Sequence, residues 1–213
     1  MTSLRKNREQ LEGKLTADPS NFPKRCKSTA LRFPASRTPG WPVHGQSCDA
    51  YAISENRADV VVTSRLPPDY LGELLLTVSF VAVAHPSHPL FTLDRALTSN
   101  DLVRYVQVVV RDSGTRNPRD EGWLGAERRC TVSSMEASLA TVLAGLGYAW
   151  LPEHMTSEPI RHGRLRALPL EMGASRPVSL HLVLVRPETA GPAARVAVEI
   201  FQRRRADTGA PGS

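Results

Sequence analysis

The sequence predicts an α/β fold, in which short buried strands alternate with helices. Three observations carry this prediction. Runs of β-branched and aliphatic residues at 58–63, 74–84 and 105–110 have the length and composition of buried strands. Residues 130–154 contain the signals for a helix, a tight turn and a strand in succession. A chain of 213 residues that is 41% hydrophobic can also bury a sizeable core.

The stretch 130–154 is the most informative part of the chain. Ser133 stands three residues before Glu136, which is the spacing of a capping box and predicts a helix that starts at Ser134. The helical spacing places four apolar side chains on one face, namely those of Met135, Leu139, Val142 and Leu143. Gly145 can end the helix in a left-handed conformation, and residues 147–151 then read as a short buried strand closed by a proline.

The start of this predicted helix is a candidate anion site. The first amides of a helix have no partner within it, and the helix dipole makes this end favourable for negative charge. The alternative is an ordinary packed helix with a serine cap, which capping statistics favour.

The net charge of +6 is confined to the N-terminal segment. Residues 1–45 hold 9 Lys or Arg and 3 Asp or Glu, whereas the rest of the chain has 18 of each sign. The expected globular part therefore gives no electrostatic reason to expect a nucleic acid or a membrane surface as partner. The basic residues at 24–37 could contact phosphates, but prolines interrupt them, and a solvated tail is the favoured interpretation.

Neither a metal, a cofactor nor an exported location is indicated. Cys26, Cys48 and Cys130 are odd in number and far apart, so they suggest no disulfide framework and no zinc site. The N-terminus lacks an apolar signal core, and no apolar stretch is long enough to span a bilayer. We therefore expect a cytoplasmic protein.

Two strand ends carry polar groups that suit a ligand. Residues 58–63 are suited to a buried parallel strand, and Thr63 and Ser64 would follow at its carboxyl end, where ligands bind in open α/β sheets. Capping of the loop by the same hydroxyls is the plainer alternative. After the strand at 105–110, a loop with Ser113, Gly114 and Thr115 offers hydroxyls beside free amides, although a charged surface loop is again the alternative.

The remaining elements are simpler. A turn rather than a metal site is expected at His85–Leu90, because prolines there prevent a helix. A short helix is expected at 97–102, capped by Ser99 or Asn100. A turn at 162–165, a strand at 178–185 and a terminal helix at 192–203 complete the chain.

From residue 56 to about 202, the chain resembles the effector-binding domain of LysR-type transcriptional regulators. The resemblance rests on an ordered set of segments: RADVVVTSRLP at 57–67, HPL at 88–90, DL at 101–102, QVVVRDSGTRN at 107–117, VSSMEASLATVLAGLGYAWLPEH at 132–154, GRLRALPL at 163–170, then HLVLV and PAARVAVEIF. Each segment alone is weak, but their order is specific.

The resemblance implies a fold like that of type 2 periplasmic binding proteins, with two α/β lobes joined by crossing strands. We expect lobe I at about 51–80 and 181–205, lobe II at about 81–180, and a frayed tail at 206–213. A small-molecule effector would bind in the cleft between the lobes. The residues expected to bind it are Thr63, Ser64, Ser113, Gly114, Thr115, Ser133 and Ser134. Because several of them stand at a helix start or in an amide-rich loop, we expect the effector to be an anion.

Residues 1–50 depart from the family pattern. The family begins with a winged helix-turn-helix, whereas this segment is Pro-rich and basic and reads as irregular, so the first lobe is expected to be incomplete. The chain alone should not recognise specific DNA. The resemblance implies a homo-oligomer, or a heteromer with full-length relatives.

Two other functions compete with effector sensing for regulation. A solute-binding protein of a transport system shares the fold, but the missing export signal argues against it. An enzyme is not expected, because the sequence has no nucleophile elbow, P-loop or HExxH motif.

Overall fold

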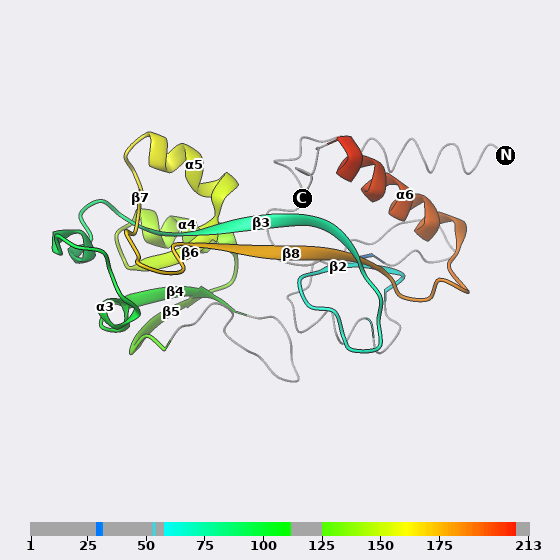
Figure 1. The fold of residues 1–213 in the computed structure, drawn as a ribbon, viewed down its shortest axis with the longest axis horizontal. Coiled ribbons are helices and arrows are strands. Elements are labelled where there is room, and N and C mark those ends of the chain that lie inside the picture. The colour runs from blue at the N-terminus through cyan, green and yellow to red at the C-terminus, as the bar shows by residue number, and fades with distance from the viewer. Residues whose placement is uncertain (1–28, 32–52, 54–57, 112–124, 208–213) are drawn as a thin grey trace. The chain divides into compact units, whose positions relative to one another are not determined.

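The computed structural model describes residues 29–31, 53, 58–111 and 125–207 (Figure 1). Its strands are β1 (Thr29–Leu31), β2 (Val60–Thr63), β3 (Glu73–Ala84), β4 (Val106–Val110), β5 (Arg128–Val132), β6 (Tyr148–Pro152), β7 (Arg166–Ala167) and β8 (Ser175–Leu184). The helices are the 3-10 helix η2 (Pro89–Thr92), α3 (Ser99–Val103), α4 (Met135–Leu143), α5 (Glu153–Arg161) and α6 (Pro192–Asp207).

The chain divides into two compact units. The described residues of unit 1 are 29–31, 53, 58–77 and 179–207, and those of unit 2 are 78–111 and 125–178. The boundaries fall inside β3 and β8, so each of these long strands contributes to both units. The boundaries expected from the sequence were 80/81 and 180/181, and the assignment of the units to the two family lobes stays a prediction.

Unit 1 contains a short antiparallel sheet built around β2. This strand pairs with β1 on one side, where Ala30 is opposite Val61, and with β8 on the other, where Val61 is opposite Val183. The strand is fully buried, as its β-branched sequence predicts. The expectation of a parallel strand is wrong, because both neighbours run antiparallel; β-branched residues suit any buried strand and do not report its direction.

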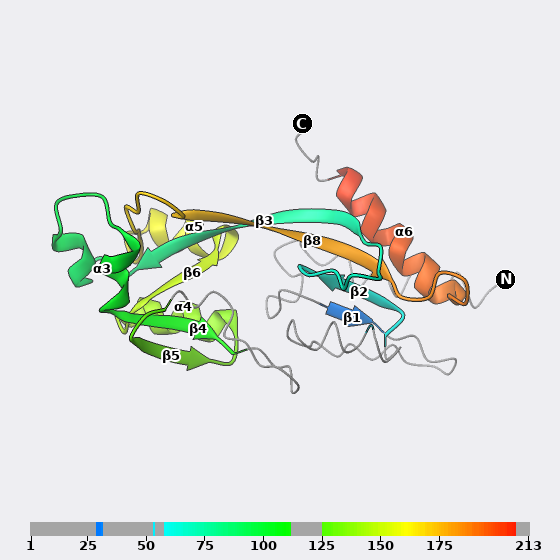
Figure 2. The same ribbon diagram turned by 60° about the horizontal axis from the view of Figure 1, so that its bottom comes forward.

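The two faces of the sheet in unit 1 are covered by different apolar clusters. Val60 and Val62 of β2 pack with Leu182 of β8 against α6, whose contacts are Ala194, Ala197 and Phe201. Val61 faces the other side, with Val183, Val185, Ile53 and Ala58. The alternation of side chains along a strand explains this division. Figure 2 shows β1 and β2 adjacent, with α6 as a separate layer over the sheet.

Unit 2 has a mixed sheet in the order β3, β6, β4, β5, with β7 on β3. β3 and β6 are antiparallel, with Ala82 opposite Trp150, whereas β4 is parallel to β5 and β6. The predicted strands at 74–84, 105–110 and 147–151 are confirmed as β3, β4 and β6, and the one at 178–185 as part of β8.

Helices cover both faces of the unit 2 sheet. α4 and α5 lie over the face that carries Phe80, Val83, Val108 and Leu151, to which Met135 and Val142 of α4 contribute. α3 and η2 pack on the opposite face, through Leu102 and Leu90. The apolar face predicted for α4 is confirmed, because its other two members, Leu139 and Leu143, also pack against this cluster.

α5 was not expected from the sequence. Its stretch opens after Pro152 and contains Pro159, and prolines normally argue against a helix. Met155 and Ile160 nevertheless pack against the cluster under α4. Burial of this apolar face outweighs the one backbone hydrogen bond that Pro159 cannot make.

The turn before η2 and the cap of α3 were also predicted from the sequence. The turn at His85–Leu90 is confirmed, since the His88 amide donates to the His85 carbonyl at 2.8 Å. The cap of α3 is Thr98, not Ser99 or Asn100, because the Thr98 amide donates to the Asp101 carboxylate at 2.8 Å.

Within residues 1–50, expected to be irregular, residues 29–31 form β1, and the rest lies outside the described residues. The terminal helix expected at 192–203 is confirmed as α6, which continues to Asp207. Among the helices in the described part of the chain, none has the length and hydrophobicity needed to cross a bilayer.

Candidate functional site

The end of β2 is the first candidate contact segment, and its threonine is committed to a local turn. Thr63 is fully buried. Its hydroxyl donates to the carbonyl of Arg65 at 3.0 Å and accepts from the amide of Arg65 at 3.1 Å. Both interactions are those of a hydroxyl that caps a turn, which is the plainer alternative given by the sequence. Ser64 is more exposed than Thr63.

The junction between β5 and α4 is the second candidate segment, and its cap differs from the prediction. Ser134 adopts an extended backbone conformation, and its hydroxyl oxygen accepts from the amide of Ala137 at 3.1 Å. α4 therefore begins at Met135, one residue later than expected. The predicted capping box between Ser133 and Glu136 is wrong, because only one of two adjacent serines can occupy the cap position.

The loss of that box leaves two polar groups near the start of α4. Ser133 is exposed, and none of the described residues hydrogen-bonds its hydroxyl. One carboxylate oxygen of Glu136, Oε2, is buried and has no hydrogen-bond partner among the described residues. An exposed hydroxyl at a helix start suits an anion, because the first amides of a helix have no partner within it, while the Glu136 carboxylate suits a hydrogen-bond donor.

The third predicted segment, with Ser113, Gly114 and Thr115, lies outside the described residues. Of the predicted site residues, the structure therefore describes Thr63 and Ser64, which belong to unit 1, and Ser133 and Ser134, which belong to unit 2.

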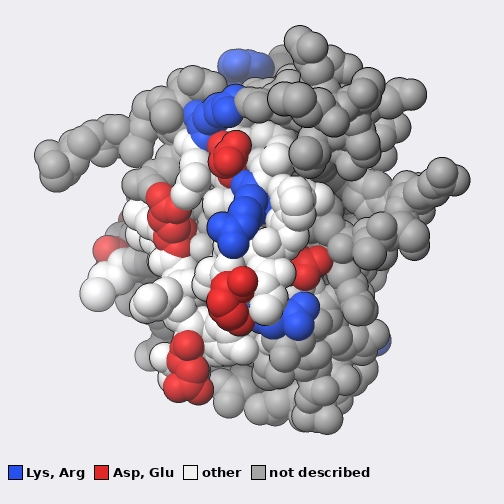
Figure 3. Space-filling model, turned by 90° about the vertical axis from the view of Figure 1, so that its right-hand side faces the viewer, with Lys and Arg blue, Asp and Glu red and all other residues white. Residues whose placement is uncertain are grey.

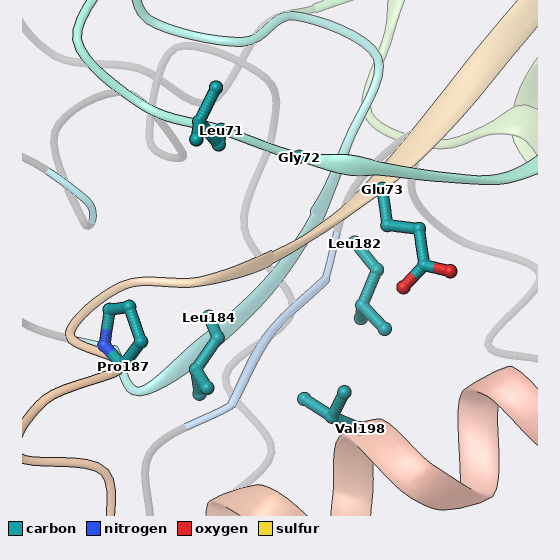
Figure 4. Close-up of a pocket in the computed structure, with 7 residues that line it drawn as sticks. All are labelled: Leu71, Gly72, Glu73, Leu182, Leu184, Pro187 and Val198. Carbon is teal, nitrogen blue, oxygen red and sulfur yellow. The ribbon is translucent and has the colours of Figure 1, made fainter.

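An open groove of about 340 Å³ lies in unit 1 between β8, the start of β3 and α6 (Figure 4). It is lined by Leu71, Gly72, Glu73, Leu182, Leu184, Pro187 and Val198. None of the predicted site residues lines it. The one acidic residue in this lining is Glu73, whose carboxylate accepts a hydrogen bond from Nε2 of Gln202 at 2.7 Å. An apolar wall with a carboxylate does not suit a small anion.

Sequence reasoning missed one polar residue beside the first segment, His181. It is the Cα partner of Thr63 across the β2–β8 pair. Its Nδ1 is buried, and no described residue is its hydrogen-bond partner. The available signal was the pattern HLVLV, in which a histidine occupies the same face as the buried Val183.

The described residues contain no group of three or more His, Cys, Asp or Glu side chains arranged to hold a metal ion. On the face of unit 1 seen in Figure 3, the described basic and acidic side chains are interspersed. The described side chains in this view therefore form no single-sign patch of the kind with which proteins attract nucleic acids.

Comparison with known proteins gives the family. Residues 46–206 match the family described as the LysR substrate binding domain. The chain belongs to this family. The structural neighbours of this LysR-type domain include regulatory domains of the same family, whose fold is that of type 2 periplasmic binding proteins. The fold class expected from the sequence is therefore confirmed.

Three proteins illustrate what the LysR-type domain is similar to. The probable HTH-type transcriptional regulator YhaJ of Escherichia coli K12 is 32% identical over 121 residues, which cover 54% of this chain and 41% of YhaJ. The structure of full-length LysG from Corynebacterium glutamicum with bound effector Arg has a TM-score of 0.55 at 18% identity, and the match covers 76% of this chain and 56% of LysG. The regulatory domain of Synechocystis CcmR in complex with 2-PG has a TM-score of 0.58 at 14% identity, and the match covers 78% of this chain and 82% of the CcmR domain. The matched part of this chain thus spans about two fifths of the length of YhaJ.

Proposed function

We propose that this chain is the effector-sensing part of a LysR-type transcriptional regulator. The observation that carries the proposal is the family match over residues 46–206, together with a two-unit α/β fold shared with regulatory domains. The role is reversible binding rather than chemistry, and the cytoplasm is its place of action. LysG, with its bound effector Arg, and CcmR, with 2-PG, make a small polar metabolite the natural class of effector.

The proposed effector carries an anionic group that binds at the start of α4. Support comes from the exposed Ser133 hydroxyl, the extended Ser134 cap and the position of both at a helix start, where the first amides have no partner within the helix. The Glu136 carboxylate opposes a bare anion by its charge. An effector that combines an anionic group with hydrogen-bond donors, such as a small amino acid or hydroxy acid, would satisfy both the amides and the buried Glu136 oxygen.

A thermal-shift panel tests this proposal. The panel contains sulfate, bromide, acetate, succinate, lactate and arginine, with glucose and urea as neutral compounds. Binding at 100 times the dissociation constant should stabilise the fold by about 2.7 kcal/mol. We expect the largest shifts from the compounds that carry both an anionic group and donors.

Ser133→Ala supplies the matched variant. We expect it to keep the ligand-free melting temperature, because the hydroxyl is exposed, and to reduce the shift produced by the best compound. Shifts from neutral compounds alone, unchanged in Ser133→Ala, would overturn the proposal.

A further inference from the structure

We propose that His181 is an effector contact in unit 1, and that its Nδ1–H donates a hydrogen bond to an anionic oxygen of the effector. The inference rests on the proposed function and extends it to a residue that lies outside the predicted site. It starts from a buried ring nitrogen at this strand end for which no described residue is a hydrogen-bond partner.

His181 lies beside the end of β2 in the sheet of unit 1. His181 on β8 is the Cα partner of Thr63 on β2. Partners in an antiparallel pair place their side chains on the same face, so His181 stands beside the segment that includes Ser64. The same alternation places both residues on the face of Val61 and Val183, opposite to the face covered by α6.

Thr63 and His181 differ in their hydrogen bonding. The Thr63 hydroxyl both donates to and accepts from Arg65, so its capacity is used within the turn. Nδ1 of His181 is buried and none of the described residues pairs with it. Buried polar atoms in folded proteins are nearly always hydrogen-bonded, so this nitrogen is open to a partner from outside the described residues, and a ligand is one such partner.

A glycine, Gly72, is one of the neighbours of His181. Gly72, directly before β3, lies against His181, since a Cβ at position 72 would be 3.1 Å from the His181 Cβ and would overlap Leu66. A side chain at position 72 would therefore crowd the histidine. The His181 residue as a whole keeps part of its surface exposed, so it is not sealed from solvent.

Three substitutions of His181 separate an effector contact from a structural role. In His181→Asn the side-chain amide lies close to the place of Nδ1, and in His181→Gln it lies close to the place of Nε2. His181→Phe keeps an aromatic ring and removes both nitrogens. Each variant is measured for ligand-free melting temperature and for its dissociation constant with arginine, succinate and sulfate.

We expect His181→Phe to melt at the same or a higher temperature without ligand, because it removes an unsatisfied buried nitrogen. We also expect it to bind the best of the three probes about tenfold more weakly. His181→Asn should restore most of that affinity, and His181→Gln should not.

The outcomes distinguish the contact from the proposed function. If the wild type binds a probe and His181→Phe binds it equally well, the contact is wrong while effector sensing stands. A lower ligand-free melting temperature for His181→Phe, with unchanged affinity, would assign His181 to the fold alone. If the wild type binds none of the three probes, both the proposal of an anionic effector and the proposal of the His181 contact are wrong.

Discussion

The end of β2 and the junction between β5 and α4 are the two described segments that the sequence singles out for ligand binding, and they use their hydroxyls differently. At the end of β2, Thr63 is fully buried and its hydroxyl is paired twice with Arg65. At the β5–α4 junction, Ser134 caps the helix and leaves the preceding Ser133 exposed.

The difference shows that a hydroxyl at a strand end is available to a ligand only after local backbone needs are met. A single threonine at a buried strand end closes its own turn. Two consecutive serines at a helix start allow one to cap and the other to remain at the surface. The second arrangement is therefore the better candidate for a ligand contact.

The largest effect on stability is expected from Thr63→Val. The substitution keeps the shape of a buried side chain but removes both hydrogen bonds to Arg65, which should lower the free energy of unfolding by about 2 kcal/mol. Urea denaturation would measure it. Thr77→Val is the control, because Thr77 is exposed and should change stability by less than about 0.5 kcal/mol. Equal effects of the two variants would mean that the Thr63 hydroxyl is not committed to the turn.

A smaller effect is expected at the cap of α4. Ser134→Ala removes the hydrogen bond to the Ala137 amide and should cost about 1 kcal/mol. Ser133→Ala should stay within about 0.5 kcal/mol of the wild type, since its hydroxyl has no described partner. Denaturation of the two variants side by side gives the answer. A larger loss of stability in Ser133→Ala than in Ser134→Ala would instead identify Ser133 as the cap of α4.

The smallest effect concerns pH and the cap of α3. Arg95 hydrogen-bonds the Asp101 carboxylate at 2.7 and 2.8 Å, and together with the Thr98 amide it holds the pKa of Asp101 well below its usual range. Because the folded-state pKa is lowered, the stabilisation is present above the unfolded pKa of about 4 and is lost as the pH falls below it.

The difference in stability between the wild type and Asp101→Asn should therefore shrink between pH 7 and pH 3 in urea titrations. Ser134→Ala provides the contrast, because a neutral serine cap should contribute equally at both pH values. A wild-type advantage over Asp101→Asn that is unchanged at pH 3 would contradict the role given to Asp101.

The sequence determined the positions of most strands and helices and the apolar face of α4, because period and composition are local properties. Gly145 illustrates this: it was expected to end α4, and its φ of 77° is the left-handed conformation that glycine adopts readily. The family likeness added the fold class, since the order of weak segments is specific even where each segment is not.

The tertiary structure decided what depends on neighbours far along the chain. The direction of β2 came from its pairing with β8, more than a hundred residues later, and no local pattern encodes a partner. The existence of α5 depended on the burial of Met155 and Ile160, which outweighs the proline within the helix. His181 became visible as a candidate only because the sheet places it opposite Thr63 and leaves its Nδ1 unpaired, and hydrogen-bond satisfaction is a property of packed neighbours rather than of sequence.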